Sequence, residues 1–320
     1  MRRSLIACCL LLILAAGLPS PARAAYPDRP IHLIVPFSPG GGVDVITRLL
    51  AHRLSERLNQ VVIVENRPGG GANIANQYVA NAAADGYTLL MYSPAAAINA
   101  SLYQNLTYNL KTDFVPVASV LSGALLLVVA ADSKFHDVHD LIAAAKAKPG
   151  ELNFASAGIG STEHLAGELF AQIAGIDVVH VPYKGTGLGL NDLLAGQVQF
   201  LFGGSAGLVP QVQSGQLRAL AQTPISKLPE LSNIPTMDQA GVPGYDVSTT
   251  IGVLAPKGTP AGAITLLNTE ISASAHDLDA RFGPLGGQAV TMSPQEFGAL
   301  IASQIAKWAG VITKAKIHVD

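Results

Sequence analysis

Apolar residues recur along the chain with two alternating periods, one typical of strands and the other of helices. Residues 31–35 are mostly apolar and β-branched, which predicts a short buried strand. Pro36, Pro39 and the glycines at 40–42 end it, and apolar residues then recur at helical spacing over residues 46–58. The free N–H groups of a glycine turn and a helix start can form a cradle for an anion. The same glycines would also serve a simple tight turn.

This succession of strand and helix continues along the chain. We expect further strands at residues 61–65, 88–92, 152–155, 178–181 and 198–202, and helices at 72–84, 141–147, 163–174 and 190–194. Such an alternation predicts right-handed crossovers and mostly parallel sheets. The small and polar residues 93–103 follow a strand, at the edge of the sheet where ligands bind in α/β proteins.

Two apolar segments, residues 115–131 and 245–254, are interpreted as strands that cross between two lobes, because the first is too long for one strand of one sheet. The predicted fold is α/β, with a mixed, mostly parallel sheet flanked by helices in each lobe. We expect lobe 1 to comprise residues 25–122 and 251–320, and lobe 2 residues 123–250. Helix starts are predicted at Thr259-Pro260 and at the capping box 293–296.

Composition and charge narrow the class of protein. The 320 residues are 49% hydrophobic and 13% charged, which indicates an ordered core. Residues 1–24 have a basic start, an apolar run and a small-residue cleavage site, and predict a secretory signal peptide that contains both cysteines. Its removal takes three arginines from 20 basic residues, which leaves 17 against 22 acidic ones, a net charge of −5. We therefore expect an exported protein without disulfides, membrane insertion or a nucleic-acid partner.

One motif suggests an enzyme. Residues 203–207 form a G-x-S-x-G pattern after a predicted strand, which is typical of a nucleophile elbow. Ser205 would then act with an acid and a histidine, for which the candidates are Asp238, Asp246, His276 and His318. Pro210 lies early in the helix that such an elbow requires, and no H-G-G-G segment exists. A secreted serine hydrolase is thus the alternative hypothesis.

Other polar residues fit a binding site or a structural role. The histidines of segment 136–140 are three residues apart without a third ligand, which favours a solvated helix start over a metal site. Asp44 either interacts with the helix dipole or receives a cation or hydroxyl of a solute. His164 is either structural or a hydrogen-bonding residue at a cleft. Tyr183 and Lys184 at a strand end would suit an organic acid. Trp308 is expected in the core.

Six motifs together resemble those of the tripartite tricarboxylate transporter solute receptors, also called Bug-type receptors. They are residues 26–31, 35–44, 64–69, 84–90, 164–170 and 180–185. The resemblance implies a periplasmic-binding-protein-like fold of type II, with two crossing strands and hinge closure around a small, usually carboxylate-bearing solute. It further implies delivery to membrane permease subunits. We expect a monomer with neither cofactor, metal nor catalytic residue. A ligand-binding sensory adaptor is a further alternative.

The resemblance also implies a set of ligand-binding residues. In lobe 1 these are Phe37, Ser38, Pro39, Gly40, Gly41, Asp44 and Ser93; in lobe 2 they are Ser161, Thr162, His164, Tyr183, Lys184 and Gly185. Gly203 and Gly204 are also expected at the binding site, where many members carry polar residues. Their lack of polar side chains makes an amino acid a less favoured ligand and leaves room for a bulkier acid. N–H groups of the turn at 40–42 would hold the carboxylate. Three or four charge-assisted hydrogen bonds of about 1.5–3 kcal/mol each would suffice for micromolar affinity.

Overall fold

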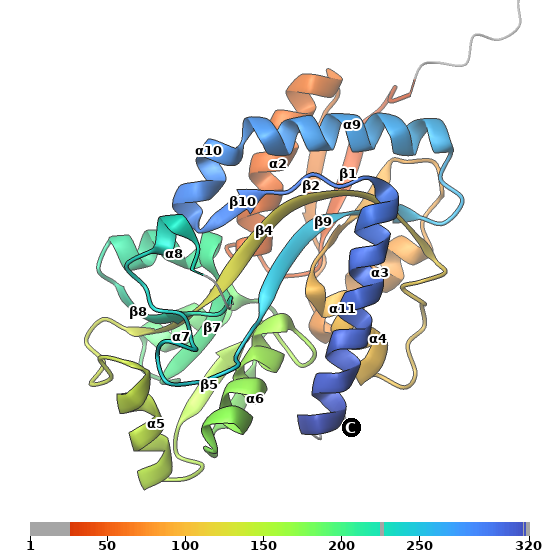
Figure 1. The fold of residues 1–320 in the computed structure, drawn as a ribbon. Helices are drawn as coiled ribbons and strands as arrows, with labels where there is room; N and C mark the ends of the chain where they lie inside the picture. The colour runs from red at the N-terminus through yellow and green to blue at the C-terminus, as the bar shows by residue number, and fades with distance from the viewer. Residues whose placement is uncertain (1–25, 225–226, 316, 318–320) are drawn as a thin grey trace, which may run out of the picture.

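The computed structural model describes residues 26–224, 227–315 and 317, so the predicted signal peptide at 1–24 lies outside the described residues. Two sheets share one long strand, β4 (Phe114–Ala130) (Figure 1). The first sheet has the order β2-β1-β3-β9-β4, with β10 also on β4; the strands are β1 (Ile31–Val35), β2 (Val62–Asn66), β3 (Thr88–Tyr92), β9 (Ser248–Pro256) and β10 (Gly287–Ala289). Its first three strands are parallel, and β9 and β4 are antiparallel to their neighbours.

The second sheet continues from the other end of β4. Its order is β4-β7-β5-β6, with β8 also on β4; the strands are β5 (Asn153–Ser156), β6 (Val179–Pro182), β7 (Phe200–Gly204) and β8 (Leu217–Gln222). β5 is parallel to β6 and β7, whereas β7 and β8 are antiparallel to β4. Each sheet, with its helices, is called a lobe below.

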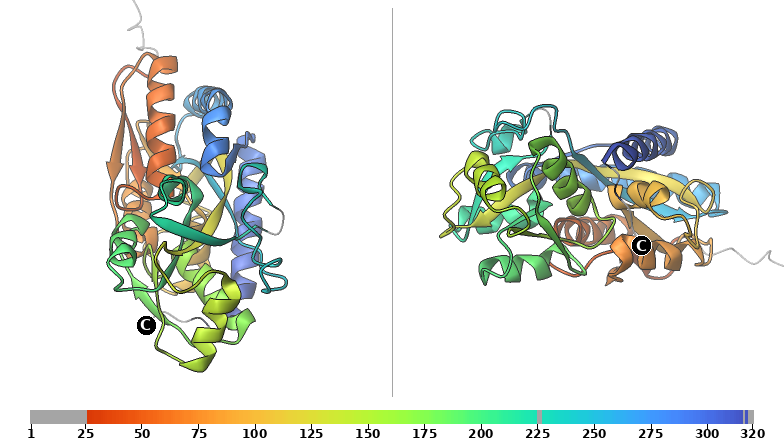
Figure 2. Two further views of the ribbon diagram at one scale, coloured as in Figure 1. Left: turned by 90° about the vertical axis from the view of Figure 1, so that its left-hand side faces the viewer. Right: turned by 90° about the horizontal axis from the view of Figure 1, so that it is seen from below.

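Helices flank both sheets. Lobe 1 has α2 (Gly42–Leu58), α3 (Asn73–Ala80), α4 (Pro94–Leu102), α9 (Ala261–Asp277), α10 (Asp279–Phe282) and α11 (Pro294–Ala315). Lobe 2 has α5 (Val138–Ala147), α6 (Thr162–Ala174), α7 (Thr186–Leu194) and α8 (Ser205–Gln213). Figures 1 and 2 show α11 running along one side of the molecule, from the sheet of lobe 1 toward lobe 2. Single-turn 3-10 helices lie at Gly70–Ala72, Pro229–Leu231 and Gly283–Leu285.

The strand β4 joins the lobes, as its length predicted. It pairs with β9 over residues 114–124 and with β7 and β8 over residues 125–130. The second connection passes from β8 into β9, where Val247 N–H donates to Thr223 O at 3.1 Å. The partner exchange after Ala124 lies near the predicted boundary at 122/123, and the lobe boundaries themselves stay a prediction.

Several local predictions were wrong. The helix predicted at 72–84 ends at Ala80, and Gly203 and Gly204 belong to β7 rather than to a turn, because they pair with Leu126 and Leu125 of β4. Thr259 does not cap α9: its hydroxyl donates to Pro256 O at 2.8 Å, and Pro260 occupies the N-cap position. The second crossing strand begins only at Ser248.

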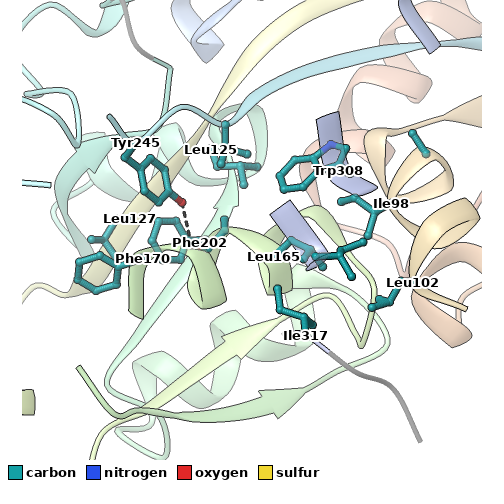
Figure 3. Close-up of a cluster of buried hydrophobic side chains, with 14 of the residues drawn as sticks. Ile98, Leu102, Leu125, Leu127, Leu165, Phe170, Phe202, Tyr245, Trp308 and Ile317 are labelled. Carbon is teal, nitrogen blue, oxygen red and sulfur yellow. Dashed lines mark hydrogen bonds between the residues drawn. The ribbon is translucent and has the colours of Figure 1, made fainter. Parts of the chain in front are cut away.

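One buried cluster extends through both lobes. Ile98 and Leu102 of α4, Leu165 of α6 and Trp308 of α11 share it, together with Ile317 (Figure 3). Apolar side chains from the two lobes thus pack together, and the lobes are closed on each other. Trp308 is the only tryptophan of the chain and is 1% exposed, so its prediction as core is confirmed.

The predicted capping box begins α11. Ser293 N–H donates to Glu296 Oε2 at 2.9 Å, and Glu296 N–H donates to Ser293 Oγ at 3.2 Å. We expect Ser293→Ala to lower the free energy of unfolding by about 1 kcal/mol, because an N–H group of the first turn loses its acceptor. Urea denaturation measures this change. Ser303→Ala, at an exposed serine of the same helix, is the control, and equal losses in both variants would contradict the assignment.

Candidate functional site

The starts of four helices meet at one cavity between the lobes. In each lobe two strands lead directly into these helices, β1 into α2 and β3 into α4, β5 into α6 and β7 into α8. The first residues of these helices line the cavity, together with Phe37 and with apolar and hydroxyl residues of the crossing strands β4 and β9. The helix-start residues are Gly42, Val43, Ser93, Pro94, Thr162, Glu163, Gly204, Ser205 and Ala206. Its volume, taken as the space open to the centres of water molecules, is about 40 Å³.

The cavity favours an anion through the backbone rather than through basic side chains. The free N–H groups of a helix start carry partial positive charge, and four starts add together here. Among the described residues that line the cavity, Glu163 alone is ionisable. Ser93 Oγ is buried and has no hydrogen-bond partner within the described chain. A buried hydroxyl without a partner indicates a place for a ligand atom or a water molecule.

The glycine turn is braced from within lobe 1. Asp44 Oδ2 accepts from Gly40 N–H and from Arg48 Nε, both at 3.0 Å, and Asn66 Nδ2 donates to Asp44 Oδ1 at 2.9 Å. Burial alone would raise the pKa of Asp44, but the hydrogen bonds from Arg48, Gly40 and Asn66 outweigh it and lower that pKa. The carboxylate of Asp44 therefore accepts hydrogen bonds from groups of lobe 1, and the N–H of Gly40 donates to Asp44.

Direct contacts hold the two lobes together beside the cavity. Ser38 donates to Lys184 O twice, through its N–H at 3.1 Å and its Oγ at 2.8 Å. Tyr103 OH of lobe 1 donates to Ile159 O of lobe 2 at 3.2 Å. The backbone of Gly42 lies so close to Gly204 that an added Cβ would come within 3.1 Å of its Cα. Glycines therefore permit this close approach of the lobes.

The predicted binding residues fall into several groups. Phe37, Ser93, Thr162 and Gly204 line the cavity. Ser38, Pro39, Gly185 and the backbone of Lys184 lie at the contact between the lobes, while Gly40, Gly41 and Asp44 form the braced turn. Gly203 packs against Thr186, and Ser161 caps α6 by accepting from His164 N–H at 3.2 Å.

The side chains of Tyr183 and Lys184 do not reach the cavity lining. Tyr183 OH donates to Asp192 Oδ2 at 2.6 Å, and the Lys184 side chain is exposed. Glu163, by contrast, lines the cavity, although its place in the sequence did not predict this. An acidic residue in a first helical turn looks the same whether that turn is exposed or covered, so no local signal marks it.

His164, which is buried, lies against the partly buried His180. The two rings stack with centroids 4.1 Å apart, and Gly160 N–H donates to His164 Nδ1 at 3.2 Å. His180 Nε2 lies 2.6 Å from Ser156 Oγ. Burial lowers the pKa of His164 to about 4, and burial together with His164 lowers that of His180 to about 3. Both rings are therefore neutral at pH 7 and support the 156–161 loop that enters α6.

The proposed elbow has no catalytic partner in the described chain. Ser205 Oγ donates to Gly286 O at 3.0 Å, and His276 is exposed in the last turn of α9. His318 lies outside the described residues.

No group of three or more potential metal ligands occurs among the residues described. In the segment 136–140, Asp137 caps the start of α5. A search of the described helices found none long and apolar enough to cross a membrane.

Two α/β lobes that share a long strand and close over a cavity define a periplasmic binding protein. Residues 46–317 match the Tripartite tricarboxylate transporter family receptor, and the chain belongs to this family. Three solved structures are similar. Rpa4515 of R. palustris with adipate is 36% identical with a TM-score of 0.88, and the periplasmic binding protein BugD is 32% identical with a TM-score of 0.88. MatC (Rpa3494) of Rhodopseudomonas palustris with bound malate is 29% identical with a TM-score of 0.85. The alignments cover 92%, 92% and 90% of this chain and 99%, 99% and 100% of those chains.

Membership of this family settles the choice between receptor and enzyme. The family consists of solute-binding receptors that are not enzymes. The serine hydrolase hypothesis was therefore wrong, and the G-x-S-x-G match arises from a strand that ends in two glycines before the start of α8.

Proposed function

We propose that the chain is a periplasmic receptor that captures a small organic carboxylate between its lobes and delivers it to the membrane permease of a tripartite tricarboxylate transporter. The observation that carries this proposal is the convergence of four helix starts on one cavity, none of whose described lining residues is basic. Similar proteins were solved with adipate and with malate, both carboxylates. In this proposal residues 1–24 direct export, and the permease takes the ligand from the receptor.

Closure is the central step of the proposed mechanism. The cavity lies between lobes that are in contact with each other, so the lobes must separate for the ligand to enter. Bending of the two connections at β4 and β9 would allow this hinge motion. The ligand carboxylate then lies against the N–H groups of α2 and the Ser93 hydroxyl of α4, while α6 and α8 of lobe 2 close over it.

A thermal-shift screen of aliphatic mono-, di- and tricarboxylic acids tests the proposal, with the corresponding amides as controls. A true ligand raises the melting temperature in proportion to the logarithm of its concentration above the Kd. The fluorescence of Trp308 provides a second signal, because this residue packs with both α4 and α6. If no acid changes either signal at millimolar concentration, or if amides and acids act equally, the carboxylate proposal fails.

Ser93→Ala is expected to weaken binding of the best acid from this screen by about tenfold, the value of one hydrogen bond to a charged group. The stability of the empty protein should stay the same or rise slightly, because the lost hydroxyl has no partner there. Isothermal titration calorimetry measures the affinity. Ser101→Ala, at the opposite end of α4, is the control, since its hydroxyl contacts Ile305 O instead. Equal affinities in the wild type and in Ser93→Ala would exclude Ser93 as a ligand-binding residue.

A further inference from the structure

The cavity holds one ionisable group that the proposed function does not explain. Glu163 is the second residue of α6, and only 9% of it is exposed. The lining residues from α2, α4, α8, β4 and β9 are apolar residues, glycines, serines or threonine, so no charged side chain of the lining faces it. A buried carboxyl group in a site made for an anion requires a reason.

A hydrogen bond positions the carboxyl group of Glu163 near the glycine turn. Thr186 Oγ1 donates to Glu163 Oε1 at 3.2 Å. Thr186 in turn faces lobe 1, because a Cβ at Gly41 would lie 3.8 Å from Thr186 Oγ1. The Glu163 carboxyl group therefore lies on the lobe 2 side of the cavity, opposite the start of α2.

We propose that Glu163 determines specificity by selecting acids that carry a hydrogen-bond donor, such as an ammonium or hydroxyl group, besides one carboxylate. This inference rests on the proposed function. The ligand carboxylate lies against α2 and α4, and its donor group meets Glu163. A second carboxylate at that position would face a like charge in a closed cavity, where repulsion is weakly screened.

The two glycines that end β7 belong to the same side of the cavity as Glu163. Gly203 and Gly204 offer no polar side chain to a ligand, and a Cβ at Gly203 would lie 2.8 Å from the Thr186 methyl group. The absence of polar residues there argued against an amino acid as ligand. Glu163 changes that interpretation, because it supplies a carboxyl group to the same side of the cavity from α6 instead of from β7.

The protonation state of Glu163 gives the inference a pH signature. Burial raises the pKa of Glu163, and hydrogen bonds from its own N–H, Thr186 and Ser161 partly oppose this. A donor group on the ligand favours the ionised form, whereas a second carboxylate requires the protonated form. The preference for donor-bearing acids should thus increase with pH. Other buried titratable groups on the elements around the cavity are His164 on α6 and Asp44 on α2, which is paired with Arg48.

The test compares acids of equal length by calorimetry at pH 6 and pH 8. One set is succinate, 4-hydroxybutanoate and 4-aminobutanoate, and the other is adipate, 6-hydroxyhexanoate and 6-aminohexanoate. In the wild type at pH 8 we expect a donor-bearing acid to bind at least tenfold more tightly than the diacid of its set. In Glu163→Gln this ratio should fall below threefold, because the diacid binds more tightly. Glu151→Gln, at an exposed glutamate of lobe 2, should keep the wild-type ratio.

Each result decides the matter. A wild type that prefers the diacid at pH 8, or a ratio unchanged in Glu163→Gln, overturns the role of Glu163 while leaving the carboxylate receptor intact. If no acid of either set and none of the screen binds, the proposed function itself fails. If Glu163→Gln does not fold, the wild-type ratio at pH 8 decides: a preference of tenfold or more for the donor-bearing acid supports the inference, and a preference below threefold overturns it.

Discussion

Replacement of Gly71 by alanine is expected to reduce ligand affinity at least a hundredfold. A Cβ at this position would lie 1.9 Å from the carbonyl oxygen of Ile159, far inside van der Waals contact. Gly71 belongs to lobe 1 and Ile159 to the 156–161 loop of lobe 2, so the clash occurs only when the lobes close. The variant should fold with its lobes apart and fail to close over a ligand. Calorimetry measures the affinity, and small-angle X-ray scattering detects the more open shape.

The neighbouring glycine offers a matched control. Gly70 and Gly71 have the same left-handed φ of +57°, so alanine at either one strains the backbone by about 1–2 kcal/mol. A Cβ at Gly70 would meet its nearest neighbour, Asn73 Cβ, at an ordinary 3.5 Å and within its own lobe. Both variants should therefore lose similar stability, while only Gly71→Ala loses affinity. Equal affinities in the two variants would show that closure does not bring these loops together.

The order of strands and helices was readable from the sequence where burial leaves a periodic pattern. β1 and β3 have the bounds predicted for them, because each is a buried apolar run with a clear limit. The run of β1 ends at a proline, and that of β3 begins after Gly86. The helix α4 was not predicted, since seven of its nine residues are buried and no polar face remains to show a period. β8 was also not predicted: its sequence, LRALAQ, resembles a helical segment as much as a strand.

The candidate site was harder to predict, because side-chain direction depends on tertiary contacts. The sequence places Tyr183 and Lys184 at a strand end, yet Tyr183 turns to Asp192 and the Lys184 side chain points to solvent. The glycine turn before α2 was expected to present its N–H groups, but Asp44 takes that of Gly40. Glu163 becomes part of the cavity only because lobe 1 covers the start of α6, which no local pattern encodes.

Acid is expected to destabilise the protein strongly through the pair His164 and His180. Both rings are neutral when folded, with pKa values of about 4 and about 3, against about 6.5 in an unfolded chain. Their contribution to stability is therefore complete above pH 6.5 and is lost as the pH falls toward these lower values, since the unfolded chain binds more protons than the folded one over this range. The loss between pH 7 and pH 4 should be on the order of 5 kcal/mol, a large part of the stability of a typical domain.

The same protonation should weaken ligand binding. A proton on His164 Nδ1 removes the acceptor of Gly160 N–H, and the loop that contains Gly160 packs against Asn99 of lobe 1. Opening of this loop would separate lobe 2 from lobe 1 beside the cavity. Affinity for the best acid should therefore fall together with stability as the pH is lowered, in addition to any protonation of the acid itself.

His180→Phe tests this account, because phenylalanine can keep the stacking on Phe154 and His164 without titrating. Urea denaturation from pH 7 to pH 4 should show a loss of stability about half as large as that of the wild type. The carboxylate of Glu168 lies 3.6 Å from His164 Nε2, and burial raises its pKa. Its protonation therefore changes stability with pH in the opposite direction to that of the histidines. For this reason the slope of the variant is compared with that of the wild type. His52→Gln, at an exposed histidine of α2, should keep the wild-type slope. A slope unchanged in His180→Phe would place the acid sensitivity elsewhere in the molecule.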